Sequence, residues 1–359
     1  MTDNHITDYV ANISNLDKKK YVEEIIFLLG IDKKKVAYHG SCTDGLISAS
    51  LLYYMNKELL FIPLDYNILK DKALRPYLAS QEWFAIIDLE PFNDNTIELF
   101  VDHHRSIIGS KINAKRIHFE LGEFGPSAAF VLYNILKNTI EIPIHLKKLV
   151  EVSTVTDTAS FKIDPPLDII DLNQDNVFLE DFDKLCWFVQ DATNIEDDYS
   201  LELNNTIMRG VSEKGIEFFL SSEHISRINA QRIKRKEAFA FCENVSVTDL
   251  MVIINSPNQT FKQFLALYLG KIGAKVIVFL TQKDSLVTIS LRQSKKNTPQ
   301  EIENLRLDLL AKTFNSSGGG HAEASGSISN SIKEAQLVLE NWVKEKNLEM
   351  SILTYKKNV

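Results

Sequence analysis

The sequence predicts an α/β protein of two domains, and three observations indicate this. The chain has 359 residues, which is more than a single hydrophobic core usually organises. In its first half, short and continuously apolar segments alternate with segments of helical spacing, which is typical of a parallel sheet covered on both faces. A second series of strands and helices begins near residue 247, after a long charged helical segment. We therefore expect a doubly wound, mainly parallel N-terminal domain at 1–200, a helical linker at 201–246 and a smaller C-terminal α/β domain at 247–359.

Four short apolar segments of the first domain are expected to form strands. They are 36–38 and the segments ELLFIPLDY, WFAIIDLEP and IELFVDHH. Helices are expected at 46–56 and in the segments FGPSAAFVLYNILKN and HLKKLVEVSTVTDTASF. In the second domain, strands are expected in VSVTDLMVIIN, AKVIVFLTQ and SLVTISLRQS, and helices in FKQFLALYLGKIG and EIENLRLDLLAKTF. The segment NSSGGGHAEASGSI is interpreted as a glycine-rich loop.

Composition and charge restrict the class of protein. Apolar residues make up 45% and charged residues 25%, as in ordinary soluble proteins. The net charge of -8 argues against broad binding to duplex DNA, which needs many Lys and Arg contacts, but permits a small anionic substrate held by a bound cation. Three widely spaced cysteines, Cys42, Cys186 and Cys242, indicate a reducing compartment. The first residues lack a signal-peptide pattern and the apolar runs are too short to cross a bilayer, so we expect a cytoplasmic protein without a membrane partner and leave a homodimer open.

Polar side chains follow the predicted strands and form four clusters. The clusters are His39 with Asp44, then Asp88, then Asp102 with His103 and His104, and finally Asp157 in the turn of TVTDTASF. A single Asp after a strand is common in turns, but four clusters at corresponding ends of one sheet predict a site, because ligands bind beyond the carboxyl ends of parallel strands. Carboxylates mixed with imidazoles suit a pair of divalent cations such as Mn²⁺. Two such ions can activate a water and stabilise the attacking and leaving oxygens at a phosphate.

These motifs resemble those of the DHH-family phosphoesterases. VDHH at 101–104 is similar to the motif that gives the family its name. HGSCTDG at 39–45, AIIDLEP at 85–91 and TVTDTASF at 154–161 are similar to the first, second and fourth motifs. GGGHAEASG at 318–326 resembles the signature loop of the C-terminal DHH-associated domain. The five motifs follow the order of the family and span most of the chain.

The resemblance implies a role for each metal-binding candidate. Asp88 would bridge two cations. Asp44 and Asp157 would complete one cation site with His103, and His39 would belong to the other. Two Mn²⁺ ions would then be the cofactors, with Zn²⁺ or another divalent ion as an alternative.

The resemblance also implies the roles of the remaining residues of VDHH and exposes one departure. Asp102 would support the site, and His104 would contact the scissile phosphate as negative charge develops there. Cys42 stands two residues before Asp44, where the family usually carries an Asp. Two interpretations stay open: Cys42 is a thiolate ligand that favours a softer ion such as Zn²⁺, or it is a small buried residue without a ligand role.

Candidates for substrate binding come mainly from the second domain. Glycines allow a close backbone approach to a ligand, and their N–H groups can bind an anion. The candidates are Gly318, Gly319, Gly320, His321 and Arg292, the last of which the resemblance assigns to phosphate, together with Arg105 beside the two histidines of the first domain. We expect a short substrate that contacts both domains.

The predicted function is a metal-dependent phosphodiesterase that hydrolyses short nucleotides, namely oligoribonucleotides or linear or cyclic dinucleotides. One alternative is a phosphomonoesterase or phosphoanhydride hydrolase acting on 3′-phosphorylated adenosine nucleotides or polyphosphate. Another is a catalytically weak nucleotide-binding protein, because Cys42 replaces a usual ligand. An exonuclease for long strands is disfavoured, because the sequence shows neither an added single-strand-binding domain nor a strongly basic groove.

Overall fold

The chain folds into two compact units, Met1–Asn229 and Ala230–Val359. The computed structural model describes residues 3–13, 15–69, 71–104, 107, 110–118, 127–171, 179–194, 200–283, 286–316, 318–320 and 322–356. Along the sequence, the boundary between the two units falls within helix α10 (Ser222–Cys242). Helix α9 (Leu201–Lys214) lies in the first unit, whose core includes Ile207, Met208 and Phe219. The ranges 1–200, 201–246 and 247–359 stay a prediction.

The first unit is built on a five-stranded parallel sheet. Its strands are β1 (Lys35–His39), β2 (Leu60–Leu64), β3 (Ala85–Ile87), β4 (Ile97–Val101) and β5 (Ala114–His118), in the order β2-β1-β3-β4-β5. The direction of winding reverses between β1 and β3, where doubly wound sheets bind their ligands. The sequence does not predict β5, because this edge strand is mostly exposed and has no apolar run.

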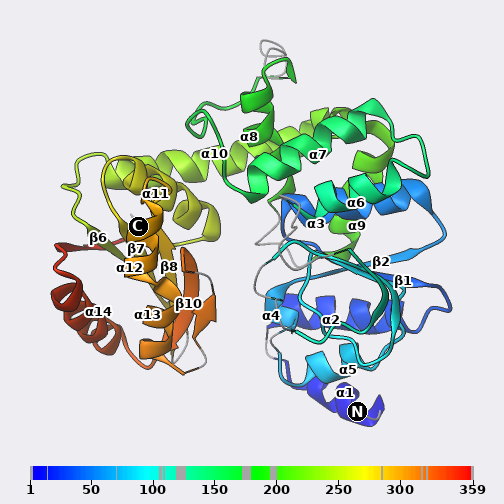
Figure 1. Cartoon of the computed structure of the whole chain (residues 1–359), viewed down its shortest axis with the longest axis horizontal. Helices are drawn as coiled ribbons and strands as arrows, with labels where there is room; N and C mark the ends of the chain where they lie inside the picture. Colours follow the sequence, from blue (N-terminus) through cyan, green and yellow to red (C-terminus); the bar gives the residue numbers. More distant parts are fainter. Residues whose placement is uncertain are drawn as a thin grey trace. The chain divides into compact units, whose positions relative to one another are not determined.

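Each face of this sheet has its own core. Because side chains alternate along a strand, Val36 and Tyr38 point to one face and Ala37 to the other. The helices on the first face include α3 (Thr43–Met55), α6 (Ala128–Leu136), α7 (Ile144–Asp157), α8 (Phe182–Thr193) and α9. Those on the second face are α1 (Asp3–Ala11), α2 (Leu16–Leu29), α4 (Tyr66–Leu69) and α5 (Leu74–Ala79). Figure 1 shows α3, α6 and α9 on one side of β1 and β2, with α2 and α5 on the other.

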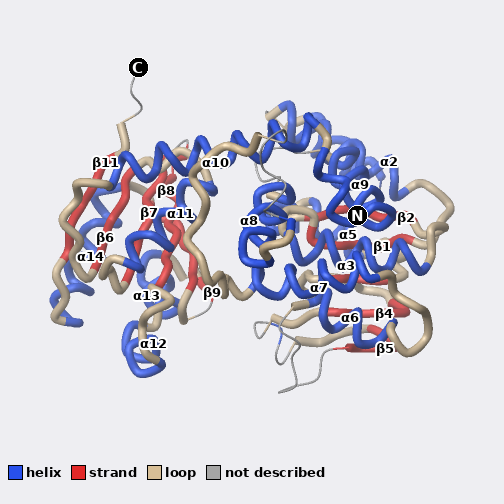
Figure 2. The backbone as a smooth tube through the Cα atoms, turned by 90° about the horizontal axis from the view of Figure 1, so that it is seen from above, coloured by secondary structure: helices blue, strands red, loops and turns tan. Residues whose placement is uncertain are grey.

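The second unit contains a mixed six-stranded sheet, seen with its strands side by side in Figure 2. The strands are β6 (Leu250–Ile254), β7 (Val276–Lys283), β8 (Leu286–Gln293), β9 (Gly319–Gly320), β10 (Ala324–Ser329) and β11 (Met350–Thr354), in the order β11-β6-β7-β8-β10-β9. The helices are α11 (Gln259–Lys271), α12 (Pro299–Leu305), α13 (Leu307–Phe314) and α14 (Ile332–Lys346). The predicted fold class, a doubly wound parallel domain with a smaller α/β domain, is confirmed.

Two predicted elements of the second unit differ from the structure. The segment EIENLRLDLLAKTF forms two helices instead of one, because Arg306 adopts a left-handed φ of 40° between α12 and α13. The expected glycine-rich loop contains β9 and β10, which pair in antiparallel fashion. Across the part of the chain that the structure describes, we find no helix with the length and apolar character needed to cross a membrane.

The two cores predict that truncating a buried side chain on a central strand costs far more free energy of unfolding than truncating an exposed side chain on the edge strand. Phe100 on β4 is fully buried in the second core, so Phe100→Ala should lower the free energy of unfolding by about 3–5 kcal/mol. Ile117 on the edge strand β5 is 39% exposed, so Ile117→Ala should change it by only about 0.5 kcal/mol. Urea denaturation followed by circular dichroism measures both values. Equal losses in the two variants would contradict this description of the core.

Candidate metal centre

The carboxyl ends of three neighbouring strands place polar side chains at one edge of the first sheet. His39 ends β1, Asp88 follows β3, and residues 102–104 follow β4. Asp44 comes from the first turn of α3, and Asp157 is the last residue of α7. The sequence predicts all these residues at strand ends. Asp157 is a correction, because it is the last residue of a helix and does not follow a strand.

Asp88 occupies the middle of this arrangement. Its side chain is 1% exposed, and its backbone has a φ of 56°, an uncommon value that is concentrated at functional sites. Its N–H donates to the Val101 carbonyl oxygen at 2.9 Å, which anchors it beside β4. Asp88 Oδ2 lies 3.5 Å from His39 Nδ1, whereas Oδ1 lies 3.6 Å from His103 Nε2. The two carboxylate oxygens therefore face two different imidazoles.

One cluster of side chains, the His103 group, consists of Asp44, His103 and Asp157. His103 Nε2 lies 3.5 Å from Asp44 Oδ2 and 3.3 Å from Asp157 Oδ2. Asp44 and His103 are largely removed from solvent, and Asp157 is the most accessible of the three. The group offers two carboxylates and one imidazole toward a common point.

The structure fixes Asp44 through donors that are distant in sequence. Its carboxylate accepts the N–H groups of Ala128 and Ala129 at 2.6 and 2.9 Å, at the start of α6. The Ser153 hydroxyl donates to it at 2.6 Å. A helix N-terminus stabilises negative charge, so the contact holds Asp44 in place. Burial, together with the charges of Asp88 and Asp157, nevertheless raises the pKa of Asp44 to about 7.

A second cluster, the His39 group, consists of His39, Cys42 and Asp88. Cys42 caps the N-terminus of α3 by accepting the Gly45 N–H at 3.2 Å. Its Sγ also lies 3.1 Å from His39 Nδ1, and its thiol donates to Asp88 Oδ2 at 3.1 Å. Burial and the charges of Asp88 and Asp44 raise the pKa of the Cys42 thiol well above its ordinary value. Gly45 is required here, because a Cβ would lie 2.0 Å from the His39 carbonyl oxygen.

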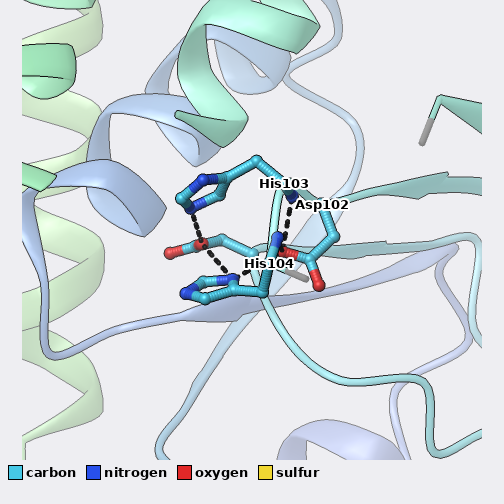
Figure 3. Close-up of side chains that lie close together, drawn as sticks. Asp102, His103 and His104 are labelled. Atoms are coloured by element: carbon cyan, nitrogen blue, oxygen red, sulfur yellow. Dashed lines mark hydrogen bonds and ion pairs between the residues drawn. The ribbon is translucent and has the colours of Figure 1, made fainter. Parts of the chain in front are cut away.

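Asp102 organises the two adjacent histidines. Its Oδ1 accepts the N–H groups of His103 at 2.7 Å and His104 at 3.3 Å, and lies 2.7 Å from His104 Nδ1. Figure 3 shows the two imidazole rings one above the other, with Asp102 beside the backbone of both residues. The ring centroids are 4.2 Å apart. Because Nδ1 of His104 is engaged, Nε2 is the ring nitrogen left to meet a ligand.

Opposite charges control the protonation of these groups. Burial opposes ionisation of Asp88, but the imidazoles of His103 and His39 outweigh it and lower the pKa of this carboxyl well below its usual range. Burial likewise opposes protonation of His104, yet the hydrogen bond with Asp102 and the charge of Asp88 raise the pKa of His104 to about 10. Without a cation, the histidines therefore supply the positive charge that the buried carboxylates need.

Divalent cations fit both groups. Within each group, the ligand atoms lie within 4.8 Å of one another. Among the described residues, Asp88 Oδ1 and His103 Nε2 are buried and have no hydrogen-bond partner, although buried polar atoms are nearly always paired. A cation between them would supply the missing interaction and offset the gathered negative charge. Oxygen and nitrogen donors suit Mn²⁺, and the Cys42 sulfur suits a softer ion.

Comparisons with known proteins identify the fold. No protein-family model matches the sequence, and no curated protein matches it. The structure resembles the pGpG-specific phosphodiesterase PggH from Vibrio cholerae, with 16% identity, 88% of this chain and 99% of the other covered, and a TM-score of 0.61. It also resembles the exonuclease RecJ bound to manganese, with 12% identity, 93% of this chain and 95% of the other covered, and a TM-score of 0.51. A third similar structure is the DHH domain of a member of a family of ribosomal proteins, with 12% identity, 93% of this chain and 92% of the other covered, and a TM-score of 0.51. The chain has the DHH fold. The fold that the sequence motifs implied is thereby confirmed.

The DHH fold brings together all the metal-ligand candidates of the first domain. Of the substrate-binding candidates, the structure describes only some. Arg292 lies on β8, where its Nη1 donates to the Leu291 carbonyl oxygen at 2.9 Å. Gly319 and Gly320 form β9. His321 and Arg105 lie outside the described residues.

Gly318 has a structural requirement of its own. Its N–H donates to the Asn315 carbonyl oxygen at 2.8 Å, so that donor is already engaged. A Cβ at this position would lie 2.2 Å from the Ala311 carbonyl oxygen on α13. Close packing against α13 therefore accounts for the glycine, and its role toward a substrate stays a prediction.

Sequence reasoning missed several neighbours of the DHH centre. Tyr66 packs edge-on against His39 with ring centroids 5.0 Å apart, and Ser41 Oγ lies 3.0 Å from His39 Nε2. Tyr66 follows β2, so the rule that site residues follow parallel strands could have found it. No local signal could have found Ser153 or the α6 N–H groups, because their contact with Asp44 depends on the tertiary fold.

The contact between His104 and Asp102 predicts a measurable titration. In chelator-treated protein, His104 should titrate with a pKa of about 10, and Asp102→Asn should lower it toward the ordinary value. Because folding raises this pKa, the contact stabilises the fold fully below about pH 6.5, the unfolded value, and the stabilisation is lost as the pH rises through about 10.

Histidine NMR spectra recorded across this pH range measure the midpoint. Glu98→Gln, on the preceding strand β4 and paired with Lys115 at the surface, is the matched control and should leave the His104 titration unchanged. A midpoint near 6.5 in the unmodified protein would be incompatible with the predicted contact.

Proposed function

We propose that this chain is a metal-dependent phosphodiesterase that hydrolyses short nucleotides, either oligoribonucleotides or linear or cyclic dinucleotides, with two Mn²⁺ ions as cofactors. The observation that carries the proposal is the position of Asp88. Its two carboxylate oxygens face the His39 group and the His103 group separately. This is the arrangement expected of a ligand shared by two cations. When bound, such ions lower the pKa of a water and stabilise the charge on a phosphate that is being cleaved.

The chain's own residues have distinct tasks in this reaction. His104 Nε2 donates a hydrogen bond to a phosphoryl oxygen as negative charge builds on it, a contact that is stronger in the transition state than in the ground state. Asp102 holds the His104 ring in place and favours its protonated form. The N-terminus of α6 orients Asp44 so that the His103 group keeps its geometry. Asp157 closes that group from the end of α7.

A short substrate is supported by two observations. The net charge of -8 disfavours a long polyanion, which would require many cationic contacts. The similar structure of PggH belongs to a phosphodiesterase specific for the linear dinucleotide pGpG. We therefore place linear dinucleotides first among the candidate substrates. RecJ bound to manganese has the same fold, which supports Mn²⁺ as the ion to test first.

A turnover screen tests this proposal. Protein supplied with Mn²⁺ should hydrolyse dinucleotides faster than adenosine 3′,5′-bisphosphate or polyphosphate, the substrates of the alternative phosphomonoesterase or phosphoanhydride hydrolase. Asp88→Asn should reduce turnover by more than about a hundredfold, because several kcal/mol of charge stabilisation depend on the shared ligand. Glu98→Gln serves as the control and should retain activity. Binding of dinucleotides without turnover of any compound would favour the catalytically weak nucleotide-binding protein.

A second prediction separates the roles of the two units. Arg292 can bind a substrate phosphate but cannot hold a cation, so Arg292→Ala should lower kcat/KM for dinucleotides by roughly 10- to 100-fold, the loss expected for a hydrogen bond to a charged group. The variant should keep its Mn²⁺ content. It should also hydrolyse an artificial ester too small to reach the second unit at the normal rate, because a substrate that never makes a contact cannot lose it.

Lys312→Ala removes an exposed cation from the same unit and is the matched control. It should behave like the unmodified protein with both substrates. If Arg292→Ala lost Mn²⁺, or lost the small ester and the dinucleotide equally, the separation of roles would be wrong.

A further inference from the structure

The two groups of the metal centre differ in their donor atoms. The His103 group offers two carboxylates and an imidazole. The His39 group offers an imidazole, a thiol and a single carboxylate, that of Asp88. Carboxylate oxygens suit ions such as Mn²⁺ and Mg²⁺. Thiolates favour softer ions such as Zn²⁺, and they also bind Co²⁺ well. Two positions with such different donors do not have the same preference for an ion.

The sulfur of Cys42 is directed into the centre. It lies 3.1 Å from both His39 Nδ1 and Asp88 Oδ2, which are the other two donors of its group. The remaining cysteines are both buried and placed differently. Cys186 is part of α8 and lies in the core of the first unit, and the Cys242 thiol donates to the Ala238 carbonyl oxygen of its own helix. Cys42 is the cysteine whose neighbours are ligand atoms.

A second observation indicates that Asp88, the carboxylate shared by the two groups, binds a cation. Asp88 is 1% exposed, and its Oδ1, which faces the His103 group, is buried without a hydrogen-bond partner among the described residues, while its Oδ2 faces His39 and Cys42. The capping contact with Gly45 explains why a small acceptor stands at position 42, but Ser or Asp would cap the helix equally well or better. The cap therefore does not account for a sulfur atom.

We infer that the metal centre is asymmetric: the His39 group, with Cys42 as a sulfur ligand, holds a softer divalent ion than the His103 group. This inference rests on the proposed two-cation phosphodiesterase and specifies its cofactors. In it, Cys42 loses its proton to solvent when the ion binds, as thiolate ligands do. The protein then carries one soft ion and one Mn²⁺ in place of two Mn²⁺ ions.

Cobalt provides a probe of this difference, because a thiolate bound to Co²⁺ produces a charge-transfer absorption in the near ultraviolet. Co²⁺ binds more tightly than Mn²⁺ to most sites, so the order of displacement identifies the softer position. The full-length protein is loaded with Mn²⁺ and titrated with Co²⁺, while released Mn²⁺ is followed by electron paramagnetic resonance. The first equivalent of Co²⁺ should release one Mn²⁺ per chain and produce the sulfur band. Release of the second Mn²⁺ should require at least about tenfold more Co²⁺. Changing a residue that only supports a metal ligand already alters metal affinity by about tenfold, so a change of ligand atom should have at least this effect.

Three variants make the titration specific. Cys42→Ser and Cys42→Asp both keep a capping acceptor for α3, so they should fold normally. Both should lack the sulfur band, and in Cys42→Asp the two Mn²⁺ ions should be released over the same range of Co²⁺. Cys242→Ala, in the second unit, should behave like the unmodified protein. A titration without the sulfur band in the unmodified protein, or a band that survives in Cys42→Ser, would overturn the inference.

Dinucleotide turnover measured on the same samples separates this inference from the proposed function. Turnover with two equivalent Mn²⁺ ions and no sulfur band would leave the phosphodiesterase standing and reject the asymmetric centre. The sulfur band without turnover of any nucleotide would reject the phosphodiesterase and retain the asymmetric centre. Failure to bind Mn²⁺ or Co²⁺ at all would reject both.

Discussion

Four carboxylates that share one small region dominate the first unit. Asp44, Asp88 and Asp102 are almost completely buried, and Asp157 lies beside them. Buried charges of one sign are strongly unfavourable unless opposite charges or hydrogen bonds compensate them. Histidines and helix N–H groups provide part of that compensation here, yet one oxygen of Asp88 has no hydrogen-bond partner among the described atoms. The rest of the unit can be understood as the scaffold that keeps these groups together, and divalent cations are the compensation that the donors fit best.

The parallel sheet makes such a concentration of charge possible. Its β1 and β3 strands are neighbours, so His39 and Asp88 lie close together although they are 49 positions apart in the sequence (88 minus 39). Helices on the first face then deliver Asp44 and Asp157 from their ends, and the N-terminus of α6 receives the Asp44 carboxylate. The core on each face is apolar and independent, so the polar groups are confined to one edge. This scaffold holds both groups of the metal centre, and Cys42 gives the His39 group a sulfur donor that the His103 group does not have.

The sequence predicted the parts of this arrangement that depend on local patterns. Continuous apolar runs identified β1 to β4, and polar residues after them identified His39, Asp88 and the three residues at 102–104. Exposed residues in β5 gave no such signal, and the left-handed Arg306 divided a segment whose spacing is helical throughout. Contacts such as that of Asp44 with Ala128 depend on how α3 and α6 pack, which neither segment encodes alone. Gly318 also packs closely against α13, a structural requirement that the sequence pattern does not reveal, and its role toward a substrate stays a prediction.

The central claim is that Asp88 is shared by two cations. Anomalous diffraction from crystals grown with Mn²⁺ tests it most directly, since the ions are located independently of the protein atoms. The account predicts two anomalous peaks at the carboxyl ends of β1, β3 and β4, one beside each oxygen of Asp88. One peak should lie near His39 and the other near His103. A single peak, or two peaks of which neither contacts Asp88, would contradict it.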